Sequence, residues 1–123
     1  MSVEATIWHY SRCSKSRKAL AILRDEEATI TLRSYLDDPP DVEELADVVQ
    51  KLGISAEELV RKKESIFKEL DVDTDAFDDE QWLELLANHP KLIERPLVFT
   101  EKGAVIGRPP EKIFEVLPDT TKV

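Results

Sequence analysis

The stretch Thr6-Ile7-Trp8-His9-Tyr10-Ser11-Arg12-Cys13-Ser14-Lys15-Ser16-Arg17 places the single cysteine of the chain just before a helical pattern, Lys18-Ala19-Leu20-Ala21-Ile22-Leu23-Arg24. A thiol at such a strand-to-helix turn lies near backbone N–H groups that have no partner inside the helix. Those N–H groups and the positive end of the helix dipole favour an anion. A helix N-terminus and neighbouring cations both lower a thiol pKa, so the pattern favours a reactive Cys13 over a buried structural cysteine.

The composition predicts one compact domain spanning residues 1–123, since 123 residues with 41% hydrophobic content are enough to form a core. No apolar run approaches membrane-spanning length, and the first residues do not resemble a signal peptide. One cysteine cannot form an internal disulfide, so we expect a cytoplasmic protein. The net charge of −9 opposes nucleic-acid binding. We therefore expect neither nucleic acid nor membrane as a partner.

Acidic residues gather in two segments, 37–47 and 71–80. The second segment alternates Asp71, Asp73 and Asp75, which raises the possibility of a metal site. It lacks the glycine at the bend and the closing glutamate of an EF-hand loop. A solvated acidic linker is the favoured interpretation, and we assign no metal.

Hydrophobic periodicity predicts strands at residues 5–9, 29–36, 97–99 and 104–106. Between the second and third strands, residues 41–89 read as a helical insertion. Gly53 is expected to end its first helix, and Ser55 with Glu58 to form a capping box that starts the next. Helices are also expected at residues 14–26, from residue 64, and at 81–88 and 111–117. The order β-α-β, helical block, β-β-α predicts an α/β fold with a four-stranded mixed sheet.

This order, with Cys13-Ser14-Lys15-Ser16 at the first strand-to-helix turn, resembles the thioredoxin superfamily. Pro96 stands directly before the third strand, where thioredoxin-like folds have a cis proline beside the active cysteine. The residues alone leave two states open, because cis bonds are nearly confined to X–Pro and a trans proline is also tolerated at a strand start.

Four motifs narrow the resemblance to the glutathione/glutaredoxin-coupled arsenate reductase family, nearest to its short bacterial members. They are Cys13-Ser14-Lys15-Ser16-Arg17, the helical insertion, Glu94-Arg95-Pro96 and Gly107-Arg108-Pro109-Pro110-Glu111. The resemblance spans roughly residues 6–117. The chain has Tyr10-Ser11 where the family usually has Asn-Pro. The resemblance implies that Cys13 is the nucleophile, that Arg61, Arg95 and Arg108 bind the oxyanion, and that His9, Ser16, Arg17 and Pro96 support the site.

These implied roles agree with the chemistry of the residue types. Arginine presents a rigid fork of donors that suits a tetrahedral oxyanion, and converging arginines would also keep Cys13 ionised. Each role has an alternative: Arg61 also fits a solvated basic helix end, and His9 a packed strand residue. The Ser16 hydroxyl is expected to donate to the thiolate.

We hypothesise that the Cys13 thiolate attacks arsenate, that glutathione attacks the resulting adduct, and that glutaredoxin resolves the mixed disulfide as arsenite leaves. The single cysteine motivates these external thiols, because the chain cannot form its own resolving disulfide. Glutathione is then a co-substrate, and no bound cofactor is expected. Two other functions stay open: a monothiol thiol–disulfide exchange protein, and a non-catalytic binding module that docks a basic partner on its acidic surface.

Overall fold

The structure, a computed structural model, describes residues 3–71 and 74–117. These residues form two compact units. The first unit runs up to Tyr35 and resumes at Arg95, and the second unit is Leu36–Glu94. The predicted helical insertion lies inside the second unit, and a single domain stays a prediction. Within the described ranges, no helix combines the length and the apolar character needed to cross a bilayer.

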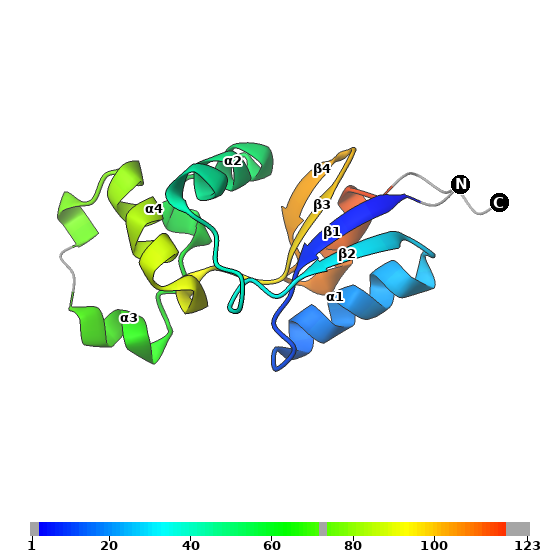
Figure 1. The fold of residues 1–123 in the computed structure, drawn as a ribbon, viewed down its shortest axis with the longest axis horizontal. Coiled ribbons are helices and arrows are strands. Elements are labelled where there is room, and N and C mark those ends of the chain that lie inside the picture. Colours follow the sequence, from blue (N-terminus) through cyan, green and yellow to red (C-terminus); the bar gives the residue numbers. More distant parts are fainter. Residues whose placement is uncertain (1–2, 72–73, 118–123) are drawn as a thin grey trace. The chain divides into compact units, whose positions relative to one another are not determined.

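The first unit contains a four-stranded mixed sheet, which confirms the predicted α/β fold class. Its strands are β1 (Glu4–Trp8), β2 (Thr29–Arg33), β3 (Leu97–Thr100) and β4 (Gly103–Ile106), in the order β2-β1-β3-β4. β1 and β2 are parallel and joined through α1 (Ser14–Asp25), whereas β3 runs antiparallel to both β1 and β4 (Figure 1). β2 ends at Arg33 rather than at residue 36 as expected, and the chain then turns with Tyr35 fully buried.

The core of the first unit lies on one face of this sheet. Alternate residues of a strand share a face, so Ala5 and Ile7 point to the same side. There they meet the apolar residues of α1 and residues that follow β4. The buried cluster consists of Ala5, Ile7, Ala19, Leu20, Leu23, Val98, Ile113, Val116 and Leu117. The core therefore fixes β1, β3 and α1 relative to one another, and these elements carry the start of the Cys13 turn.

The last element is a 3₁₀ helix, η4 (Pro110–Glu115), where the sequence predicted a helix over residues 111–117. Pro110 opens it, as a residue without an N–H does at a helix start. Beyond it, the Thr100 hydroxyl donates to the Val116 carbonyl, and the Lys102 ammonium donates to the Leu117 carbonyl. These bonds tie the end of η4 to the turn between β3 and β4.

The second unit is built from helices α2 (Val42–Leu52), α3 (Ser65–Leu70) and α4 (Asp79–Asn88), with 3₁₀ turns η1 (Glu57–Leu59), η2 (Thr74–Ala76) and η3 (Pro90–Leu92). α2 packs against α4, whose buried face includes Trp82, Leu85 and Leu86. Gly53 ends α2 with a φ of 69°, a conformation that glycine adopts without a steric cost. This element order confirms the predicted helical character of the insertion.

The helix predicted after Ser55 is shorter than expected. Ser55 does cap it, since its Oγ accepts the Glu58 N–H at 3.4 Å, but only the single turn η1 forms. The backbone beyond it pairs with a distant segment: Arg61 N donates to Leu92 O at 2.7 Å, and Glu94 N donates to Leu59 O at 2.8 Å. A complete capping box lies at Asp78 and Gln81, which start α4. The acidic linker thus ends in a helix cap, while Asp73 lies outside the described residues.

Candidate functional site

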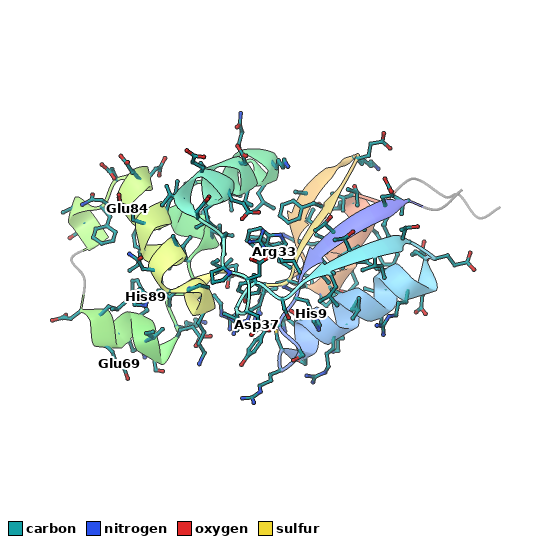
Figure 2. All side chains as sticks on the ribbon, viewed as in Figure 1. His9, Arg33, Asp37, Glu69, Glu84 and His89 are labelled. Carbon is teal, nitrogen blue, oxygen red and sulfur yellow. The ribbon has the colours of Figure 1, made fainter. Side chains whose placement is uncertain are left out.

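Cys13 occupies the N-cap position of α1, directly after the turn that follows β1. Its N–H donates to the Tyr10 carbonyl at 2.9 Å, and its carbonyl accepts the Arg17 N–H at 3.0 Å, so the loop closes before the helix begins. The side chain is half-buried. Figure 2 shows His9 at the end of β1, beside the start of this helix. The structure therefore places Cys13 at the turn from strand to helix, as the sequence predicts.

The environment of Cys13 lowers its thiol pKa. Burial acts in the opposite direction, because removing a thiolate from water raises the pKa of Cys13. This effect is outweighed by the backbone N–H groups of Ser16 and Lys15, by the Ser16 hydroxyl and by Arg95, each of which favours the thiolate. The sulfur does not make a regular helix-capping hydrogen bond, so these contacts act as a loose cage of donors. A thiol in such a cage is more nucleophilic at neutral pH than an ordinary cysteine.

Ser16 lies one turn into α1 and is fully buried. Its Oγ accepts the Tyr10 N–H at 3.4 Å. A hydroxyl has one proton to donate, and the bond from Tyr10 leaves that proton available for the Cys13 sulfur. The structure thus places Ser16 where the sequence expected a donor to the thiolate.

Arg95 stands directly before β3 and is 4% exposed, an unusually low value for a charged side chain. Its NH1 donates to the Tyr35 hydroxyl at 3.4 Å. Its guanidinium carbon lies 4.8 Å from the centre of the Tyr10 ring, in cation–π geometry. Arg95 also contributes to the lowered pKa of Cys13, so this predicted arginine lies near the thiol. No local sequence signal marks Tyr10 or Tyr35 as a site residue.

Arg108 follows β4 and lies next to the segment that carries Arg95. Its NH1 donates to the Arg95 carbonyl at 3.3 Å. The Arg95–Pro96 and Arg108–Pro109 peptide bonds are both cis. The cis state of Pro96 is one of the two that the sequence left open, whereas the second cis bond was not anticipated. The pairing of β3 with β4 brings the two Arg-Pro pairs together, since Leu97 is opposite Ile106.

His9 and Arg17 have supporting positions. His9 is 7% exposed, and its backbone N–H donates to the Arg33 carbonyl at 2.8 Å. Burial is the main effect that lowers the pKa of His9, and the charges of Arg17 and Arg24 lower it further. A hydrogen bond with the Ser16 backbone acts in the opposite direction and is the smallest of these effects. The imidazole is therefore mainly neutral at pH 7. Arg17 is exposed, and its NH1 donates to the Ser11 carbonyl at 2.8 Å, which braces the Cys13 loop.

Arg61 belongs to the second unit. Its guanidinium pairs with Glu64 at 3.1 Å and with Glu94 at 3.5 Å. Arg61 is thus not a freely solvated helix end, and its predicted role toward an oxyanion stays a prediction. Across residues 3–71 and 74–117, the histidine, cysteine and acidic side chains form no group of three or more that is placed to hold a metal ion.

Comparison with known proteins agrees with this architecture. The chain is 44% identical to an arsenate reductase of Neisseria meningitidis serogroup A over 93% of its own length and 98% of that protein. It is 37% identical to an arsenate reductase of Escherichia coli K12, over 95% of its own length and 83% of that protein.

Among solved structures, an arsenate reductase from Vibrio cholerae matches with a TM-score of 0.90 and 38% identity, covering 95% of this chain and 100% of that one. This similarity confirms the thioredoxin-like fold expected from the sequence. The ArsC family matches residues 8–116, from the end of β1 to the residue after η4. The chain therefore belongs to the ArsC family.

Proposed function

We propose that this protein is an arsenate reductase in which the Cys13 thiolate attacks arsenate, with glutathione and glutaredoxin as the external reductants. The observation that carries the proposal is the position of Cys13 at the start of α1, with Ser16 buried in the first turn and Arg95 buried before β3. The similarity to proteins named arsenate reductase supports the choice of substrate. No bound cofactor takes part in the proposed reaction.

In this proposal Arg95 and Arg108 bind the arsenate oxygens. Arg95 lies at the sulfur, and Arg108 is held to the Arg95 backbone at 3.3 Å, so both guanidinium groups belong to one anion-binding region. Two rigid forks of donors beside a thiolate orient a tetrahedral anion for attack and stabilise the charge that develops on its oxygens. Arg61, held by Glu64 and Glu94, is proposed as a third arginine of the site.

The first step forms a bond between the Cys13 sulfur and arsenic, and one arsenic–oxygen bond breaks as that oxygen leaves as water after protonation. Glutathione thiolate then attacks the Cys13 sulfur of the adduct. A disulfide forms, the sulfur–arsenic bond breaks, and its electron pair reduces arsenic from the pentavalent to the trivalent state, which leaves as arsenite. Glutaredoxin thiolate attacks the glutathione sulfur of the mixed disulfide and releases the Cys13 thiolate.

The external thiols follow from the cysteine count. With one cysteine, the chain has no second thiol with which to release the adduct. A reducing cytoplasm supplies glutathione and keeps a lone activated thiol reduced, so we propose that the protein acts there.

A coupled assay tests the proposal. NADPH oxidation is followed with arsenate, glutathione, glutaredoxin and glutathione reductase, and the wild type is compared with Cys13→Ser. We expect arsenate-dependent turnover that is lost in the variant. A wild type that shows no turnover, while its Cys13 reacts readily with an alkylating agent at neutral pH, would exclude arsenate as substrate. Thiol–disulfide exchange would then be the favoured function.

A further inference from the structure

The buried Arg95 is enclosed by two tyrosines that come from separate segments. Tyr10 belongs to the loop after β1 and places its ring 4.8 Å from the guanidinium carbon. Tyr35 follows β2 and accepts the Arg95 NH1 proton at 3.4 Å. The cation is thus held by the face of one ring and by the hydroxyl of another.

Both tyrosines are themselves fixed. Tyr35 is fully buried and stacks on Trp8, with ring centroids 6.1 Å apart and an interplanar angle of 24°. Tyr10 is tied to the Cys13 loop by its backbone, because its carbonyl accepts the Cys13 N–H and its own N–H donates to Ser16 Oγ. The Tyr10 ring therefore extends from a backbone that is bonded to the loop carrying the thiol.

This arrangement limits the positions that the guanidinium can adopt. A ring on one face leaves the in-plane N–H groups as donors, and the Tyr35 hydroxyl takes one of them. The ring and the hydroxyl together fix the direction of the guanidinium, and a planar guanidinium needs a fixed direction to bind an oxyanion with two donors. Without the ring, one of these two constraints is lost and the guanidinium gains positions that are not beside the sulfur.

We propose that Tyr10 and Tyr35 are positioning residues that hold the Arg95 guanidinium beside the Cys13 sulfur, Tyr10 through its ring and Tyr35 through its hydroxyl. For the oxyanion this inference rests on the proposed function. For the thiol it does not, because a cation beside a thiolate lowers the thiol pKa whichever substrate is used.

The test is the pH profile of Cys13 alkylation by iodoacetamide, measured in the absence of arsenate. Tyr10→Leu removes the ring and is expected to slow alkylation about threefold to tenfold at pH 7, with the midpoint of the profile displaced upward. Tyr10→Phe keeps the ring and is expected to restore the wild-type profile. Phe114→Leu is the matched control, because it removes a 51% exposed ring on η4 that has no contact with Arg95 among those described.

A double-mutant cycle separates positioning from a general loosening of the loop. If Tyr10 acts through Arg95, Tyr10→Leu slows alkylation in the wild-type background and adds nothing in an Arg95→Gln background. If Tyr10 only shapes the loop, Tyr10→Leu shifts the alkylation profile equally in the wild-type and Arg95→Gln backgrounds, and the proposal is wrong. Tyr35→Phe, which removes a single oxygen, gives a second test: it is expected to displace the midpoint in the same direction as Tyr10→Leu.

An unchanged midpoint in folded Tyr10→Leu and Tyr35→Phe would overturn the proposal even if the wild type reduces arsenate. Conversely, a wild type that does not reduce arsenate would overturn the proposed function and leave the alkylation result standing. Where arsenate is turned over, Tyr10→Leu is further expected to raise KM for arsenate more than Tyr10→Phe does.

Discussion

Gly107 and Pro96 are in such close contact that residue 107 has no room for a side chain. A Cβ at this position would lie 2.9 Å from Cγ of Pro96, closer than real Cβ atoms approach their neighbours. The Gly107 N–H also donates to the Pro96 carbonyl at 2.7 Å. The residue before Arg108 is thereby held against the residue after Arg95, so the positions of the two arginines depend on this contact.

Gly107→Ala is accordingly expected to destabilise the protein by about 1–3 kcal/mol, the usual cost of overpacking, because the Pro96 ring cannot turn aside like a flexible side chain. Urea denaturation measures this change. The same variant should lose arsenate turnover beyond what its stability explains, since both arginines shift. A variant with the wild-type denaturation midpoint would show that the contact relaxes without cost.

Ser16→Ala is expected to raise the pKa of Cys13, because the thiolate loses the Ser16 hydroxyl but keeps the backbone N–H groups. The lowered pKa of Cys13 also fixes how the thiol contributes to the stability of the fold at different pH. A thiol whose folded pKa is lowered stabilises the fold above its unfolded pKa and loses that contribution as pH falls through the folded pKa.

The alkylation profile of Ser16→Ala should therefore lie at higher pH than that of the wild type. Ser14→Ala, which alters an exposed serine of the same helix turn, is the control and should leave the profile in place. A Ser16→Ala profile that coincides with the wild type would remove the hydroxyl from the account of thiol activation.

Arg108→Ala is expected to lower kcat/KM for arsenate on the order of a hundredfold, the typical effect of removing one donor to a developing oxyanion. Arg24→Ala removes the same charge from an exposed position on α1 and should change kcat/KM little. Steady-state kinetics with arsenate as the varied substrate distinguishes the two. Equal effects of both substitutions would mean that Arg108 acts only through the net charge.

His9 is expected to make the fold less stable in mild acid. Its pKa is lowered in the folded state, so the unfolded chain binds its proton first as pH falls below about 6.5. The full stability is present above that pH and is lost as pH falls toward the folded pKa. His9→Phe, which cannot be protonated, should show a shallower decline of unfolding free energy between pH 7 and pH 5. Parallel declines would contradict a buried neutral imidazole.

Periodicity and capping residues were enough to predict the sheet and most helices. The β-prone run of β1, the alternation in β2, the apolar stripe of α1 and the glycine after α2 are local signals, and the structure follows them. The prediction failed for the length of the helix after Ser55, whose cap forms but whose helix ends after one turn. Backbone bonds from residues 59–61 to residues 92–94 replace the expected helix, and no local pattern reveals such pairing.

The residues alone predict a contact of the site only where one segment contains both partners, whereas Arg95 and Arg108 were expected from the family resemblance. Cys13 and Ser16 lie within one helix turn, so their contact follows from the sequence. The enclosure of Arg95 by Tyr10 and Tyr35 depends on three segments that meet only in the folded first unit, since 60 residues separate Tyr35 from Arg95. The tight contact between Gly107 and Pro96 depends in the same way on the pairing of β3 with β4.

Electron transfer from Cys13 to arsenate can be measured in a single turnover without glutaredoxin. Reduced protein is mixed with arsenate and glutathione, arsenite is quantified, and the mass of the intact protein is measured by mass spectrometry. We expect arsenite in an amount equal to the protein, with glutathione bound to Cys13 as a mixed disulfide. Glutathionylated Cys13 formed without arsenite, or to the same extent when arsenate is left out, would show that Cys13 does not reduce arsenate.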